Sequence, residues 1–295
     1  MDPVPLYEGM VTDPALLGVA AIVAEVRECT GTWLELFRPE AMRGLATVVA
    51  VSASGLEHRD LATLTKLGAW ICAFDDMVDD SDVTDDELSL RIAQYEQLIC
   101  DRECPELAFD PIAQVLSTVL NALSSAPLGR PLWPLLASQL VAACHAMQWE
   151  RSAAAARARG KRTPLDVYLQ HGADSICVGF VVTAAAMLIG EPATLSQVPA
   201  LQVAQRHSAM AVRIANDLAT WSREKTEAFA SNALAFAGEE SIVPLRDRIE
   251  TELRALSFTL ARVSSELPRT VSFIRRFTDC FVTLYRHGEL TDAGR

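Results

Sequence analysis

An apolar stretch that ends abruptly in a dense group of carboxylates constrains this chain most. Residues 73–86 read AFDDMVDDSDVTDD. In a helix, Asp75 and Asp79 lie one turn apart on one face, where ionised carboxylates repel each other. The arrangement is favourable if a cation such as Mg²⁺ lies between them, because Mg²⁺ takes oxygen ligands and commonly bridges to phosphates. The alternative is a solvated acidic turn at a helix end.

A second polar pattern follows much later, where residues 216–224 read NDLATWSRE. At about 100° per residue, Asn216, Thr220 and Glu224 project at roughly 0°, 40° and 80° around a helix. An amide oxygen, a hydroxyl and a carboxylate on one face make a second set of hard oxygen ligands for Mg²⁺. The alternative is a polar helix face stabilised by i, i+4 pairs.

Two arginines extend the face of this second pattern. Arg213 projects at roughly 60° and Arg223 at roughly −20°, both beside the candidate ligands. Guanidinium groups match phosphate oxygens bidentately. We therefore expect metal ions and arginines to bind one diphosphate group together. A salt bridge on the surface or between helices is the alternative for Arg213.

The pair of motifs, DDMVD with Asp75, Asp76 and Asp79 followed by NDLATWSRE, resembles the metal-binding motifs of class I terpene synthases. The resemblance covers most of the chain. It implies an all-α fold, a single bundle of about ten or more helices around a central cavity. It also implies three Mg²⁺ ions that hold and ionise a prenyl diphosphate, with Asp75, Asp76 and Asp79 of the first motif taking part in catalysis.

One segment departs from the family pattern. Bacterial members usually carry a diphosphate-sensing arginine one turn after a Tyr-Leu pair, followed by a helix break. Here Gly172 stands at or near that position, and the segment YLQHGADSI is instead similar to bacterial ent-kaurene synthases, which act on a bicyclic diterpenyl diphosphate. Gly172 and Gly179 permit a kink or a close approach of substrate, unless they are packing glycines. Cys177 and Phe180 join them in the expected substrate-binding segment, and Arg213 is the candidate replacement for the sensor.

Aromatic residues near these motifs have two interpretations. They can be core packing, or the wall of a cavity in which ring faces stabilise a substrate cation. The residues concerned are Trp70, Phe74, Trp149, Phe180 and Trp221. Near the C-terminus, Tyr285 and Arg286 imperfectly resemble an Arg-Tyr pair that closes over diphosphate in bacterial members. Lys161 and Arg162 are placed to reach a diphosphate or to lie in a solvated loop.

Composition restricts the partners. A net charge of −12 argues against nucleic acid and against docking on anionic lipid through charge. The longest uncharged run, residues 175–190, is too short for a membrane span. The N-terminus lacks a basic signal-peptide region, and an odd number of cysteines, seven, fits free thiols in a reducing compartment. We expect a cytoplasmic protein with one domain over residues 1–295 and a mobile segment at 1–13. The sequence leaves the oligomeric state open, with a homodimer as one alternative.

The hydrophobic pattern is helical throughout, without convincing strand alternation. Asp110-Pro111 and Thr163-Pro164 have the pattern of helix starts, Thr84 with Glu87 that of a capping box, and Gly288 that of a helix stop. The expected helices span residues 14–28, 39–53, 59–79, 85–100, 111–124, 131–158, 164–189, 198–226, 242–266 and 269–287.

Three classes of function fit these features. The first is a cyclase acting on a prenyl diphosphate. We expect a C20 substrate, with geranylgeranyl diphosphate ahead of a copalyl-type diphosphate and farnesyl diphosphate third, because small residues in 178–186 would line a roomy cavity. The second is a chain-elongating prenyltransferase, which would need an aspartate-rich motif near position 216. The third is a non-catalytic isoprenoid-binding helical protein.

Overall fold

The computed structural model describes residues 19, 22–24, 26, 39–226 and 231–288. Within these ranges the chain is helical, and the single β-type pairing is an isolated bridge between Ser54 and Leu56. The fold is therefore all-α, as predicted. The expected helix 14–28 lies largely outside the described residues, and the segment 1–13 lies wholly outside them.

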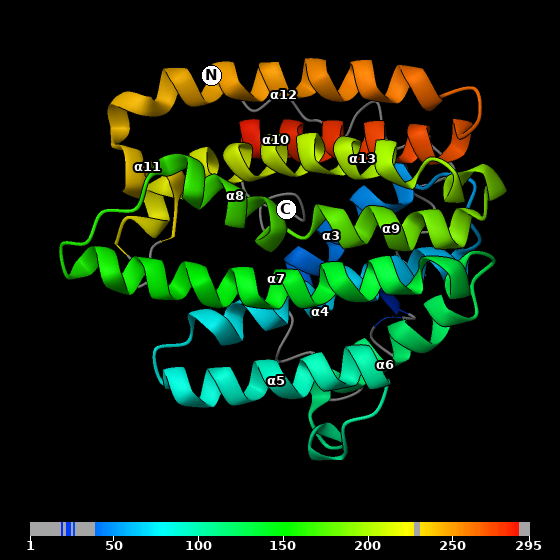
Figure 1. Ribbon diagram of the computed structural model, residues 1–295, viewed down its shortest axis with the longest axis horizontal. Coiled ribbons are helices and arrows are strands. Elements are labelled where there is room, and N and C mark those ends of the chain that lie inside the picture. The colour runs from blue at the N-terminus through cyan, green and yellow to red at the C-terminus, as the bar shows by residue number, and fades with distance from the viewer. Residues whose placement is uncertain (1–18, 20–21, 25, 27–38, 227–230, 289–295) are drawn as a thin grey trace.

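The helices pack together around one hydrophobic core (Figure 1). They are α3 (Pro39–Ser52), α4 (His58–Asp79), α5 (Asp85–Asp101), α6 (Pro111–Ser124), α7 (Gly129–Ala158), α8 (Leu165–Ser175), α9 (Val178–Ile189), α10 (Val198–Glu224), α11 (Ala233–Ala237), α12 (Ile242–Val263) and α13 (Pro268–His287). Three short 3₁₀ helices, Pro105–Leu107, Pro192–Leu195 and Glu239–Ser241, lie between them.

Helix α9 has the most central position for the site. It packs against α4, α7, α10 and α13, and nearly all of its side chains are buried. Helix α10 packs in turn against α8, α12 and α13. The two helices that carry the predicted metal motifs, α4 and α10, are thus joined through α9.

Local signals explain most helix boundaries. The side chain of Asp110 accepts a hydrogen bond from the Ala113 amide at 2.9 Å, which caps α6. Thr84 and Glu87 form the predicted capping box of α5, and α13 ends at Gly288. One start was wrong: Pro164 is the residue before α8 and no side chain caps this helix, so Thr163 does not have the expected role.

The expected helix 164–189 was also wrong in its continuity. It is broken between α8 and α9 at Cys177, whose φ of 67° lies in the left-handed region. Such a conformation is unfavourable for a residue with a Cβ atom. The break falls at neither glycine, so tertiary packing rather than glycine flexibility fixes it.

Residues 165–189 together are long and apolar enough for a membrane span, but 83% of the most apolar window is buried inside the bundle. This segment is a core element of the fold.

Candidate active site

The first motif occupies the last turns of α4. Asp75, Asp76 and Asp79 all have side chains open to solvent. Desolvation by the surrounding protein raises the pKa of Asp75 well above its usual value, and the carboxylates of Asp79 and Glu150 raise it further, while Arg213 opposes the rise. Asp75 therefore faces groups from α7 and α10 as well as its own helix.

A buried arginine holds the backbone of this acidic turn. Nη1 of Arg151, on α7, donates to the carbonyl of Val78 at 2.6 Å and to that of Asp80 at 2.9 Å, and Nη2 donates to the carbonyl of Val83. A cation at a helix C-terminus satisfies carbonyls that have no partner within the helix. The turn after α4 is thus fixed from outside the motif.

The second motif lies on the last two turns of α10. Thr220 is buried, and Asn216 and Glu224 are half-buried. The Thr220 hydroxyl donates to the Asn216 carbonyl at 3.0 Å, which leaves its lone pairs for other partners. One Glu224 oxygen contacts Arg223 at 3.3 Å, and the other accepts a hydrogen bond from Asn232 at 2.9 Å.

Arg213 lies one turn before Asn216 and is buried in a polar network. Its guanidinium contacts Glu150 of α7 at 3.3 Å and Asp217 of α10 at 3.1 Å. It also donates to the Tyr168 hydroxyl and, at 2.8 Å, to the Ser231 carbonyl. Burial raises the pKa of Asp217 to about 7, with Arg213 opposing the rise. A salt bridge between helices was the alternative expected for Arg213 from the sequence, and the Arg213–Glu150 pair is such a bridge. A diphosphate contact would use the same guanidinium.

Gly172 leaves the space that Arg213 occupies. A Cβ atom at position 172 would lie 3.1 Å from Cγ and 3.2 Å from Nε of Arg213. On the same face of α8, the Ser175 hydroxyl accepts from Arg213 at 3.2 Å. The absence of a side chain at 172 and the position of Arg213 are therefore complementary.

Tyr285 connects the two motifs. Asn216 and Arg213 of α10 and Asp75 of α4 all shift its pKa, so its side chain lies near both motifs. Burial raises the pKa of Tyr285, and Asn216 opposes that rise. Asp75 on α4 and Asn216 on α10 therefore lie at one site, although they are far apart in sequence.

The remaining predicted site residues divide between the core and other contacts. Trp70, Phe74 and Phe180 are fully buried, and Trp70 lies 5.4 Å from Phe74 and 6.2 Å from Phe180 between ring centroids. Trp149 stacks on His171 at 3.9 Å. This packing satisfies the core interpretation, and contact of any of these rings with substrate stays a prediction.

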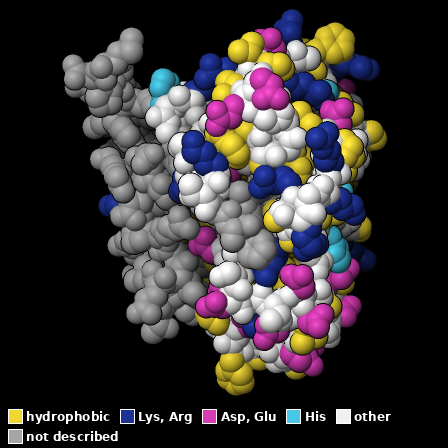
Figure 2. Space-filling model, turned by 90° about the vertical axis from the view of Figure 1, so that its left-hand side faces the viewer, with side chains coloured by type: hydrophobic (Ala, Val, Ile, Leu, Met, Phe, Trp, Pro, Cys, Tyr) yellow, Lys and Arg dark blue, Asp and Glu magenta, His cyan; other side chains and the backbone are white. Residues whose placement is uncertain are grey.

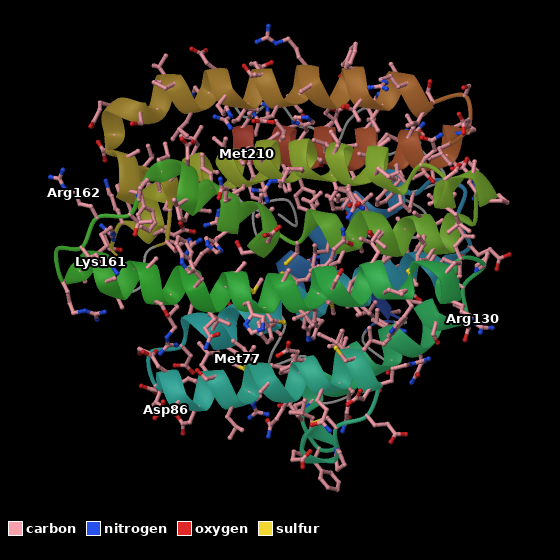
Figure 3. All side chains as sticks on the ribbon, viewed as in Figure 1. Met77, Asp86, Arg130, Lys161, Arg162 and Met210 are labelled. Carbon is pink, nitrogen blue, oxygen red and sulfur yellow. The ribbon has the colours of Figure 1, made fainter. Side chains whose placement is uncertain are left out.

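Several predicted contacts point elsewhere. Trp221 Nε1 donates to Glu239, and Arg286 pairs with Glu250. Gly179 lies against Gln139 beside a separate pocket of about 270 Å³. Cys177 is buried within electrostatic range of Asp75. Figure 3 shows Lys161 and Arg162 in the loop between α7 and α8, and both side chains are exposed.

Sequence reasoning missed four residues that hold the site together: Glu150, Arg151, Asp217 and Asn232. Asp217 sits inside NDLATWSRE directly after Asn216, and no role was predicted for it from the sequence. Glu150 and Arg151 are adjacent opposite charges in the largely apolar helix α7, and both are buried. An isolated charged pair in an apolar helix was the signal that could have identified Glu150 and Arg151. No sequence signal pointed to a role for Asn232 at the site.

The donor set fits a divalent cation. Within the described ranges, no three His, Cys, Asp or Glu side chains form a group that could hold a metal ion unaided. Asp75 and Asp79, together with the amide, hydroxyl and carboxylate on α10, are hard oxygen donors of the type that Mg²⁺ takes with water and phosphate oxygens. The end of the bundle seen in Figure 2 carries interspersed acidic and basic side chains.

Comparison with known proteins agrees with this geometry. The profile of terpene synthase family 2, C-terminal metal binding, matches residues 66–247, more than half of the chain. No curated protein sequence matches the chain.

Solved structures share the fold. Linalool/nerolidol synthase from Streptomyces clavuligerus, in complex with 2-fluorogeranyl diphosphate, has a TM-score of 0.72 at 17% identity, covering 90% of this chain and 94% of that one. For cucumene synthase the TM-score is 0.71 at 14% identity, with coverage of 92% and 96%. Abietadiene synthase from Abies grandis has a TM-score of 0.72 at 16% identity, and the match covers 92% of this chain but 37% of that larger protein. The chain belongs to terpene synthase family 2, and it is a metal-dependent enzyme that ionises a prenyl diphosphate.

Proposed function

We propose that this terpene synthase is a Mg²⁺-dependent cyclase that converts geranylgeranyl diphosphate into a cyclic diterpene. The observation that carries the ionisation step is the 3.3 Å contact between Arg213 of α10 and Glu150 of α7, both within electrostatic range of Asp75, because it supports a single site built from both motifs. A copalyl-type diphosphate is the second candidate substrate, and farnesyl diphosphate is the third.

The C20 proposal is supported by the small residues of α9. Ala184, Ala185 and Ala186 are buried in a helix surrounded by α4, α7, α10 and α13. Small side chains at the centre of a bundle leave volume for a long isoprenoid chain. The similar linalool/nerolidol synthase, whose structure is a complex with 2-fluorogeranyl diphosphate, favours the alternative of a shorter substrate.

The residues divide the chemistry between them. Asp75 and Asp79 on one side, and Asn216, Thr220 and Glu224 on the other, would hold three Mg²⁺ ions, which neutralise charge on the diphosphate when bound. Arg213 and Arg223 would bind diphosphate oxygens. The bond between the allylic carbon and the diphosphate oxygen breaks, and its electron pair leaves with the diphosphate. Apolar side chains then exclude water from the resulting cation.

The test is incubation of the full chain with geranyl, farnesyl, geranylgeranyl and copalyl diphosphates, with Mg²⁺ or with EDTA, followed by gas chromatography and mass spectrometry. We expect cyclic C20 products from geranylgeranyl diphosphate and none with EDTA. Robust cyclisation of farnesyl diphosphate without C20 turnover would refute the substrate proposal. Diphosphate release that continues at the same rate with EDTA would refute the metal mechanism.

A further inference from the structure

Asn232 lies outside both metal motifs, yet it contacts the second one. It directly precedes α11, and its side chain is completely buried. It lies eight positions after Glu224 in the chain, and the fold returns it to the last turns of α10. A buried amide at the end of a metal-binding helix needs a full account of its hydrogen bonds.

The hydrogen bonds of Asn232 fix the orientation of its amide. Oδ1 accepts from the Leu234 amide at 2.9 Å and so caps α11. The NH₂ group must therefore face α10, where it donates to the Asp217 carbonyl at 2.7 Å and to Glu224 Oε2 at 2.9 Å. Both hydrogens are used, and the Thr220 hydroxyl lies at 3.5 Å.

These contacts determine what Glu224 can do. Glu224 is the last residue of α10, where helix ends fray and a long side chain samples several rotamers. Because Asn232 holds Oε2, the carboxylate keeps one direction. Oε1 is then the oxygen that remains directed away from the α11 contact, beside Arg223 at 3.3 Å.

We propose that Asn232 is a positioning residue for the second metal motif, which holds the Glu224 carboxylate in its metal-binding orientation. The inference rests on the proposed metal role of Glu224. Partners of metal ligands tune affinity from outside the coordination sphere, and their loss typically lowers metal affinity by about 10- to 100-fold. Asn232 also couples α11 to the site, since the same side chain caps that helix.

The experiment measures Mg²⁺ binding by calorimetry in the presence of inorganic diphosphate. Asn232→Ser keeps an oxygen that can cap α11 but removes both N–H donors. We expect its Mg²⁺ affinity to fall by about 10- to 100-fold. In a Glu224→Ala background the same substitution should have little further effect, because its partner is already absent.

Asp110→Ser is the control, since Asp110 caps α6 through the Ala113 amide and also pairs with Arg91, and α6 is not among the principal neighbours of α10. It should lower the melting temperature and leave Mg²⁺ binding unchanged. Asn232→Thr provides a second cap without N–H donors, and binding is measured at a temperature at which circular dichroism shows both variants folded.

The outcomes separate the two proposals. Unchanged Mg²⁺ affinity in Asn232→Ser, or an equal loss in the wild-type and Glu224→Ala backgrounds, would overturn the positioning role. Wild-type protein that binds no Mg²⁺ with diphosphate would instead overturn the proposed function itself.

Discussion

The two metal motifs differ in how much of their geometry the protein fixes beforehand. At the first motif, Arg151 holds the backbone of the turn, while Asp75 stays open to solvent and is crowded by Asp79 and Glu150. At the second, Thr220 is buried and Glu224 is held by Asn232. One site is rich in like charge, and the other is ordered by hydrogen bonds.

This difference indicates separate roles during binding. Like charges on one helix face are unfavourable until a cation arrives, so the first motif gains most from metal. At the second motif the Asn232 amide and Arg223 orient Glu224 before metal binds, so this candidate ligand requires less rearrangement. Removing a ligand should therefore abolish activity at either motif, but the effects on stability should have opposite signs.

The largest expected effect is on turnover after loss of a metal ligand. Asp75→Ala, Asn216→Ala and Glu224→Ala should each lower kcat by about 100-fold or more, because a metal contributes several kcal/mol of charge stabilisation. Asp80→Ala and Asp82→Ala should have much smaller effects. Steady-state kinetics with a prenyl diphosphate measures this, and equal losses in all five variants would mean that the acidic turn acts through bulk charge.

Arginine-to-lysine substitutions should rank next. Arg213→Lys and Arg223→Lys keep the charge but lose the planar fork, and one lost hydrogen bond to a charged group is worth about 1.5–3 kcal/mol, so kcat should fall by roughly 10- to 100-fold. Arg213→Lys should also lower stability because its buried network is broken.

Arg223, which is half exposed with 48% of its side chain accessible, should lose activity without a change in melting temperature. A wild-type kcat in both lysine variants would mean that groups other than Arg213 and Arg223 bind the diphosphate.

Gly172→Ala tests whether the missing side chain positions Arg213. The new Cβ would lie 3.1 Å from Arg213 Cγ, and such overpacking typically costs about 1–3 kcal/mol. We expect lower thermal stability and a moderate fall in kcat. In the control Gly179→Ala, the new Cβ would meet Gln139 at an ordinary 3.5 Å, and stability should rise by about 0.5–1 kcal/mol. The reverse order of stability would refute the complementarity.

The candidate ligands are easier to recognise in the sequence than their surroundings are. Asp75 and Asp79, or Asn216 and Glu224, are recognisable because helical spacing alone places each pair on one face. Most helix boundaries followed from the same periodicity and from caps such as Asp110. These are local properties, which a short stretch of chain determines.

The missed features depend on contacts between distant segments. Gly172 and Gly179 indicated a kink in this segment, but nothing in the sequence placed the break at Cys177, where α8 ends and α9 begins. Asn232 resembles an ordinary helix cap in sequence, and its contact with Glu224 exists only after the chain folds back. Arg151 likewise acquires its role from the turn after α4, which lies about 70 residues earlier.

The smallest expected effect tests the charge difference between the motifs directly. Desolvation and the neighbouring carboxylates raise the pKa of Asp75 in the folded protein. Protonation of Asp75 therefore stabilises the folded state below about pH 4, and this contribution is lost as the pH rises through the raised pKa. Asp75→Asn should therefore melt at a higher temperature than wild type without metal near neutral pH. Relief of one like-charge pair is worth about 0.2–0.5 kcal/mol, a shift of about 1 °C, and the difference should grow between pH 4 and neutral pH. Mg²⁺ with inorganic diphosphate should reverse the order by stabilising the wild type alone. Scanning fluorimetry across this pH range measures both effects. If Asp75→Asn melted at a lower temperature than wild type without metal, the protein itself would already offset the like-charge repulsion at the first motif.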